Sequence, residues 1–175
     1  RTHSATADES ISKMMEHDLF AAYNTGRLTP QEFHIRLSER FGLQHSFDEF
    51  KHLWCHVFSP MPERLELTMA LKKQYRIGML SDTDPLHWAH ILDRFPVAAL
   101  FDRPTLSFQI GFRKPDRRAF LAAADAVDTP PPQCLYIYDL SVNVAGAAAV
   151  GMDAVQFVSV PQLKQELAAR SIQYE

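Results

Sequence analysis

Glycine, cysteine and long apolar runs are scarce in this sequence. Six glycines and two cysteines occur among its 175 residues. The glycines form neither a G-x-G-x-x-G fingerprint nor a Walker loop, which excludes the common dinucleotide and P-loop sites. Cys55 and Cys134 stand far apart and outside any C-x-x-C pair, so neither a disulfide scaffold nor a zinc module is indicated. We therefore expect a reducing, cytoplasmic environment.

Strong charge of either sign is also missing. The net charge is −3, and no basic cluster suggests binding to nucleic acid or to an anionic membrane. No apolar run approaches the roughly 20 residues of a membrane-spanning helix. The first ten residues are polar and lack the apolar centre of a signal peptide. Hydrophobic residues make up 46% of the chain and charged residues 22%, which is typical of a globular domain with its own core.

The first third of the chain carries helical patterns. Thr29 and Glu32 form a predicted capping box, with Pro30 at the first helical position and Gly42 at the end. A second box follows at Ser46 and Glu49, ahead of an apolar stripe. Together with a helical pattern before Gly26, these features predict three helices between residues 10 and 58, followed by a proline-rich joint at 59–64.

After the joint, strand and helix patterns alternate. Helices are predicted at 62–75, 83–95, 114–127, 141–151 and 161–170, and strands at 76–81, 133–139 and 153–158, with one or two short strands within 99–111. This alternation indicates an α/β fold in which helices flank a Rossmann-like parallel sheet. The predicted division is a helical part, 1–60, and an α/β part, 61–175.

Polar residues follow the predicted strands at the edge where parallel sheets bind ligands. Ser81 and Asp82 follow one strand, Asp139 and Asn143 follow another, and Lys114 begins a helix. A hydroxyl, a lysine and a carboxylate on one rim suit a phosphorylated substrate with Mg²⁺. The same residues also suit helix caps and a solvated loop lysine, so both interpretations remain open at this point.

A histidine pair is a weaker candidate. His52 and His56 are spaced i, i+4 on one predicted helix, as two metal ligands can be. No third ligand stands nearby in the sequence, so surface or packing histidines are the favoured interpretation.

Three motifs carry a resemblance to a known family. The segments MLSDTD (79–84), GFRKPDRRAF (111–120) and YIYDLSVNVAGAAAVGM (136–152), in this order and spacing, resemble the haloacid dehalogenase-like (HAD) superfamily of phosphatases and dehalogenases. Residues 1–60 resemble its helical cap, and 61–175 resemble its α/β core.

The resemblance implies a role for each matching residue. Ser81 matches the hydroxyl residue that binds the phosphoryl group, and Lys114 the lysine that neutralises its charge. Asp139 matches the acidic Mg²⁺ ligand. Asp82 and Asn143 are expected next to the bound substrate. The implied substrate class is small phosphorylated metabolites, and a homodimer is one assembly to be tested.

The departures from the family pattern are equally specific. The family's nucleophile is an Asp in a D-x-D segment after the first strand, and this chain has no such segment, since Asp8 precedes a helical pattern. Asp82 stands where a neutral residue is usual and is expected to repel phosphate. Tyr138 replaces one half of an acidic pair, so Lys114 loses a partner and Mg²⁺ binding should be weak or absent.

Two functions follow from this balance. The first is a phosphatase-type HAD-like hydrolase that works through an aspartyl intermediate; its nucleophile segment is not in this chain, which is expected to be inactive as printed. The alternative is a non-catalytic HAD-like module that binds a ligand or partner. A phosphoacceptor receiver domain fits poorly, because its lysine follows its hydroxyl and its aspartate precedes both.

The absent strand would lie in the middle of the family's sheet. Its loss would leave unpaired backbone at the neighbouring strands, which is costly in a buried place. Three explanations compete: the strand belongs to a longer protein, another chain or exchanged segment supplies it, or the fold has closed around the loss.

Overall fold

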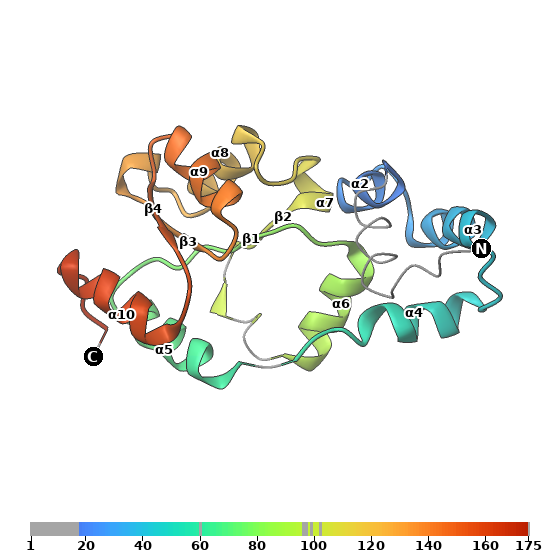
Figure 1. The fold of residues 1–175 in the computed structure, drawn as a ribbon, viewed down its shortest axis with the longest axis horizontal. Coiled ribbons are helices and arrows are strands. Elements are labelled where there is room, and N and C mark those ends of the chain that lie inside the picture. Colours follow the sequence, from blue (N-terminus) through green and yellow to red (C-terminus); the bar gives the residue numbers. More distant parts are fainter. Residues whose placement is uncertain (1–17, 60, 96–97, 99, 102, 175) are drawn as a thin grey trace, which may run out of the picture.

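The computed structural model describes residues 18–59, 61–95, 98, 100–101 and 103–174. Its helices and strands alternate from α5 onward, and its strands pair in parallel, which confirms the α/β fold class. In Figure 1 the helices α2, α3 and α4 lie at one end, α5 and α10 lie at the other, and the strands lie between them.

The first three described helices form where the sequence predicts them. They are α2 (Asp18–Asn24), α3 (Pro30–Phe41) and α4 (Phe47–Cys55). Both predicted capping boxes are present, and Gly42 ends α3 in the left-handed conformation. The start of the first predicted helix, at 10–17, lies outside the described residues.

An aromatic core holds these three helices together. Phe33 of α3 is fully buried and stacks on Tyr23 of α2, with ring centroids 4.2 Å apart. The Trp54 ring of α4 meets Phe33 edge-on at 5.1 Å, and Phe50 packs beside both. Leu86 of α6 packs against the same cluster, so this core reaches into the α/β part. The division at residue 60 therefore stays a prediction.

The remaining elements follow the predicted order. The helices are α5 (Pro62–Lys72), α6 (Pro85–Arg94), α7 (Ser107–Ile110), α8 (Arg117–Ala126), the short helix η2 (Pro131–Gln133), α9 (Ser141–Ala149) and α10 (Val160–Ala169). The strands are β1 (Leu80–Ser81), β2 (Thr105–Leu106), β3 (Leu135–Tyr138) and β4 (Asp153–Gln156). The strand β1 is much shorter than the predicted strand at 76–81.

The segment 99–111 contains one short strand, as predicted, and also a helical turn that was not predicted. The strand β2 stops at Leu106, and residues Ser107–Ile110 form the helical turn α7. The Ser107 hydroxyl donates to the Thr83 carbonyl at 3.0 Å and accepts from the Thr83 amide at 2.9 Å. Because this buried side chain occupies backbone groups beyond β1, the strand pairing cannot continue and the chain turns.

The parallel strands fall into two pairs rather than one continuous sheet. β1 pairs with β2, β3 pairs with β4, and no strand of the described residues joins the pairs. The Thr105 amide donates to the Met79 carbonyl at 2.8 Å, so the next carbonyl, that of Leu80, faces the opposite edge of β1. The two pairs have not joined through β1 and β3, which argues against a fold that closed around a lost strand.

Two glycines provide a matched test of how α2 meets α7. Gly26 and Gly42 both have left-handed backbone, with φ of 71° and 67°. A Cβ at Gly26 would overlap the Phe108 carbonyl oxygen, whereas a Cβ at Gly42 would meet nothing within 4 Å.

We expect Gly26→Ala to lower the free energy of unfolding by about 2–4 kcal/mol, since overlap with rigid backbone adds to left-handed strain. Gly42→Ala should cost only the strain, about 1–2 kcal/mol. Urea unfolding measures both variants. Equal losses would show that α2 does not lie against α7 as described.

Candidate active site

The carboxyl end of β1 delivers a run of polar residues. Ser81, half buried, is the last residue of β1, and Asp82 follows it directly. Thr83 is fixed by Ser107, and Asp84 caps the start of α6. The β1–β2 pairing thus positions Ser81, and contacts beyond the strand position Thr83 and Asp84.

Lys114 reaches this end of β1 from the loop before α8. Its side chain is almost completely buried, with 1% exposed. The Lys114 ammonium donates to the Leu80 carbonyl at 3.2 Å and lies 3.3 Å from an Asp82 carboxylate oxygen. It also lies 4.8 Å from the centre of the Tyr138 ring, at the end of β3. The ammonium thus occupies the space between the carboxyl ends of β1 and β3.

The charges at this rim depend on one another. Burial lowers the pKa of Lys114, although the neighbouring Asp82 carboxylate opposes the shift and Asp139 opposes it further. Burial raises the pKa of Tyr138, helped by the charges of Asp139 and Asp82. A lysine with a lowered pKa in a buried place is a frequent feature of functional sites.

Asp139 and Asn143 lie beyond β3 with different surroundings. Asp139 is exposed, and its backbone carbonyl accepts a hydrogen bond from the Gln156 side chain at 2.9 Å. Asn143 is buried in the first turn of α9, where its backbone amide donates to the Leu140 carbonyl. Asp139 interacts with Lys114 through its charge alone.

The structure thus brings some of the predicted site residues together more closely than others. Lys114 and Asp82 are in direct contact, and the Asp139 charge acts on both Lys114 and Tyr138. Within the described part of the chain, neither Ser81 nor Asn143 makes a hydrogen bond to Lys114. We call Ser81, Asp82, Lys114, Tyr138 and Asp139 the strand-end cluster.

The strand-end cluster does not make a complete magnesium site. Magnesium prefers octahedral oxygen ligands, commonly one or two carboxylates with water and substrate. Across residues 18–174, leaving aside those the structure does not describe, no group of three acidic, histidine or cysteine side chains is placed to hold a metal. Asp82 is engaged by Lys114, which leaves Asp139 as the carboxylate open to an ion. In the same described part of the chain, His52 and His56 have no third metal ligand beside them.

A buried polar network next to the cluster was not predicted from the sequence. The Asp84 carboxylate is 1% exposed and accepts from Trp54 Nε1 at 3.1 Å and from His87 Nδ1 at 2.9 Å. Its other oxygen accepts from the Leu86 and His87 amides, each at 3.0 Å, and caps α6. Burial and the Asp84 charge together raise the pKa of Tyr23. The carboxylate thus links α4 to α6.

The imidazole of His87 completes this link. Its Nε2 lies 2.8 Å from the Trp54 carbonyl oxygen, and its ring stacks on the Trp54 indole at 5.2 Å. Each ring nitrogen therefore lies within hydrogen-bond distance of an oxygen, one from the cap of α6 and one from α4. The sequence predicted a helix over 83–95, but no sequence pattern indicated that the Asp84 carboxylate would meet Trp54.

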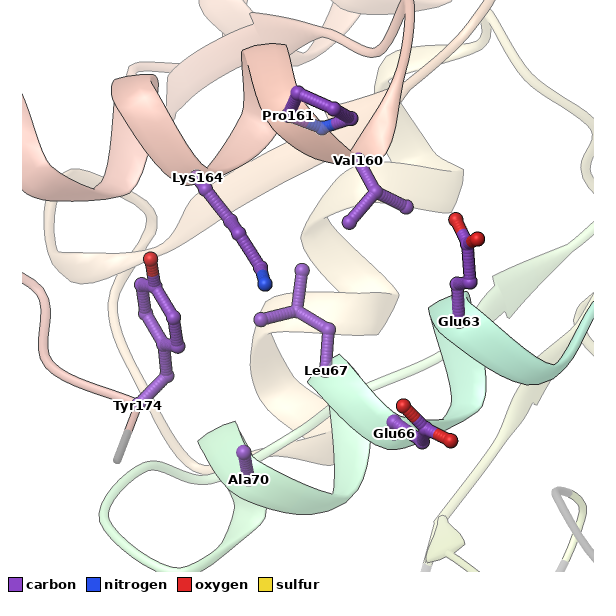
Figure 2. Close-up of a pocket in the computed structure, with 8 residues that line it drawn as sticks. All are labelled: Glu63, Glu66, Leu67, Ala70, Val160, Pro161, Lys164 and Tyr174. Carbon is purple, nitrogen blue, oxygen red and sulfur yellow. The ribbon is translucent and has the colours of Figure 1, made fainter.

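A hollow of about 450 Å³ lies elsewhere, between α5 and α10 (Figure 2). Its lining residues are Glu63, Glu66, Leu67, Ala70, Val160, Pro161, Lys164 and Tyr174. None of them belongs to the strand-end cluster. Its acidic side chains and its one lysine do not form a phosphate site, so we assign the chemistry to the strand ends.

The family assignment comes from a comparison with protein-family models. The model of the haloacid dehalogenase-like hydrolases matches residues 16–151, which is more than half of the chain. The chain belongs to the haloacid dehalogenase-like hydrolase family. This confirms the resemblance drawn from the three motifs, and the strand-end cluster contains residues from two of them and Lys114 from the third.

Individual relatives of this HAD-like hydrolase support the same family. The chain is 26% identical to a D-ribitol-5-phosphate phosphatase from Bacteroides thetaiotaomicron over 170 residues, covering 93% of this chain and 82% of that protein. A HAD family enzyme from the same organism, solved with magnesium and inorganic phosphate, shares the fold with a TM-score of 0.78 at 23% identity, covering 89% and 84% of the two chains. A predicted HAD-like hydrolase from Porphyromonas gingivalis gives a TM-score of 0.76 at 25% identity, covering 90% and 83%.

In the part of the chain that the structure describes, every helix is too short or too polar to cross a bilayer.

Proposed function

We propose that this chain belongs to a phosphatase that hydrolyses phosphate esters of small metabolites. The observation that carries the proposal is the buried ammonium of Lys114 at the carboxyl ends of β1 and β3. A buried cation at these strand ends suits the charge of a phosphoryl group, and water has little access to screen it. Family membership and the phosphatase among the relatives support this function.

The proposed roles follow the positions of the side chains. Ser81 binds a phosphoryl oxygen, Lys114 neutralises its charge, and Asn143 orders the start of α9 below the substrate. Asp139 contributes one ligand to Mg²⁺, with further ligands from groups that the described residues do not supply. The related Bacteroides enzyme was solved in complex with magnesium and inorganic phosphate, which supports the use of magnesium here.

The attacking carboxylate is proposed to come from a strand that pairs between β1 and β3. The open edge of β1 presents the Leu80 carbonyl to this space, and the Lys114 ammonium now occupies it. A parallel strand there would end beside Ser81 and Lys114 and would bring an aspartate to the phosphorus. The described residues contain no such strand.

The substrate class is proposed from the relative and from the helices. The related Bacteroides phosphatase acts on D-ribitol-5-phosphate. Residues 1–60 are proposed to form a cap over the substrate, held to the core through Trp54 and Asp84. A sugar-alcohol or sugar phosphate therefore heads the list of compounds to test.

The experiment is a phosphate-release assay on the protein purified with its natural amino terminus. p-Nitrophenyl phosphate and D-ribitol-5-phosphate are supplied with Mg²⁺, with and without EDTA. We expect metal-dependent release, with Lys114→Met lowering kcat/KM by about 100-fold or more, as for loss of a charge that stabilises the transition state. Asp93→Asn is the control, since Asp93 is exposed and pairs with Arg94.

The second candidate is a non-catalytic HAD-like module that binds a ligand or partner. It is favoured by the incomplete metal site and by the contact that occupies both Asp82 and Lys114. No phosphate release above background from any ester, together with binding of inorganic phosphate by calorimetry, would support the module and contradict the phosphatase.

A further inference from the structure

The two departures at positions 82 and 138 meet at the same ammonium. The Lys114 Nζ lies 3.3 Å from an Asp82 oxygen on one side and 4.8 Å from the Tyr138 ring centre on the other. A carboxylate next to the phosphoryl-binding serine and a tyrosine after β3 each look like a defect when considered alone. Their shared contact with one side chain gives them a common explanation.

Asp82 also holds the backbone of the loop that carries the lysine. The oxygen that contacts Nζ, Oδ1, accepts the Lys114 backbone amide at 3.1 Å. Both ends of Lys114 are therefore tied to one carboxylate oxygen, and the Leu80 carbonyl takes a further hydrogen of the ammonium at 3.2 Å. Hydrogen bonds between charged partners are stronger than neutral ones, so this arrangement fixes the loop and the amine together.

Burial makes Lys114 depend on its contact with Asp82. Lys114 is 1% exposed and Asp82 19% exposed, so each charge would lie largely out of water without the other. A buried ammonium without a counter-ion is costly and tends to lose its proton or move to solvent. Tyr138 offers the ammonium the face of a ring and not a carboxylate.

We propose that Asp82 is a positioning residue: it is the counter-ion of Lys114, and it takes the place of a carboxylate at position 138. Asp82 does not line the substrate, and its charge is directed at Lys114 instead of at phosphate. Under this proposal Asp82 does not repel phosphate, contrary to the expectation from the sequence. The inference rests on the proposed function only in treating Lys114 as the phosphoryl-binding group.

The test relocates the carboxylate next to the Lys114 ammonium from position 82 to position 138. Asp82→Asn removes the charge at nearly constant shape, and the double variant Asp82→Asn/Tyr138→Glu places a carboxylate where the Tyr138 ring now lies. Accessible lysines are acetylated with N-hydroxysuccinimide acetate, and the rate at each lysine is followed by peptide mass spectrometry. The exposed Lys51 and Lys164 serve as internal references, and Asp93→Asn as the matched control.

We expect Asp82→Asn to raise the acetylation rate of Lys114 about tenfold or more relative to the references, as for loss of a hydrogen bond between charged groups. The double variant should return the rate to within about threefold of the original protein, and Asp93→Asn should leave it unchanged. A return of the Lys114 rate in the double variant would show that Asp82 acts as a counter-ion. An aspartate with a purely structural role would not be replaced by a carboxylate at position 138.

Two results would overturn the proposal: an unchanged Lys114 rate in Asp82→Asn, or a double variant that reacts as fast as the single one. If Asp82→Asn does not fold, the proposal requires the double variant to fold, and an unfolded double variant contradicts it. The labelling needs no turnover, so a failed phosphatase assay leaves this result standing, and the converse also holds.

Discussion

Replacing Asp84 with alanine is expected to lower the free energy of unfolding by about 3–5 kcal/mol, the range seen when one partner of a buried charged pair is removed. The substitution leaves Trp54 Nε1 and the His87 ring without their acceptor and removes the side-chain cap of α6. Since the carboxylate joins α4 to α6, the loss should loosen both helices. Guanidinium unfolding followed by tryptophan fluorescence measures it.

The pH dependence of stability tests whether the Asp84 carboxylate is ionised in its contact with His87. Burial alone would raise the pKa of Asp84, but the hydrogen bonds and charge of His87 outweigh it and hold the pKa below its usual range. A lowered pKa in the folded state gives stability that is present above the unfolded pKa of about 3.9 and is lost as pH falls through the folded value. The difference between the original protein and Asp84→Ala should therefore shrink below about pH 4. A difference independent of pH would contradict an ionised Asp84.

Phe33→Ala is expected to cost about 3–5 kcal/mol of stability, as for other fully buried phenylalanines. Phe33 is 0% exposed and contacts three aromatic rings, stacked on Tyr23 and packed against Phe50 and Trp54. The cavity would open at the centre of the α2–α4 cluster, where the surrounding rings cannot collapse easily. Urea unfolding measures the loss.

Ile35→Ala on the same helix is the matched control for Phe33→Ala. Ile35 is 54% exposed, so its truncation should change stability by no more than about 0.5 kcal/mol. Similar losses in the two variants would place the aromatic core elsewhere than on the buried face of α3.

Local patterns allowed accurate prediction where a few neighbouring residues decide the structure. The capping boxes at Thr29 and Ser46 formed as predicted, because a hydroxyl and a glutamate three residues apart satisfy the same helix end in any context. The helical turn that begins at Ser107 was not predicted, since it accompanies hydrogen bonds between Ser107 and Thr83, 24 residues away in the chain. The pattern within 99–111 carries no trace of that contact.

In the candidate site, too, the sequence predicted the residues but not all of their contacts. The strand-end rule and the three motifs selected Ser81, Lys114 and Asp139, and the structure brings Lys114 into contact with the end of β1. The partner of Lys114 was not predicted, since Asp82 and Lys114 are 32 residues apart and charge alone suggested repulsion of the substrate. Direction of a side chain decides whether a carboxylate repels a phosphate or pairs with a lysine.

The sequence by itself determined the α/β class, the order of the main helices and strands, the capping boxes of α3 and α4 and the HAD-like family, because each rests on local periodicity or on short motifs. Only the tertiary structure decided that the strands form two separate pairs, that Asp82 faces Lys114 and that Asp84 joins α4 to α6. These outcomes depend on contacts between residues distant in the chain, whose energies are set by burial and distance once the backbone has brought them together.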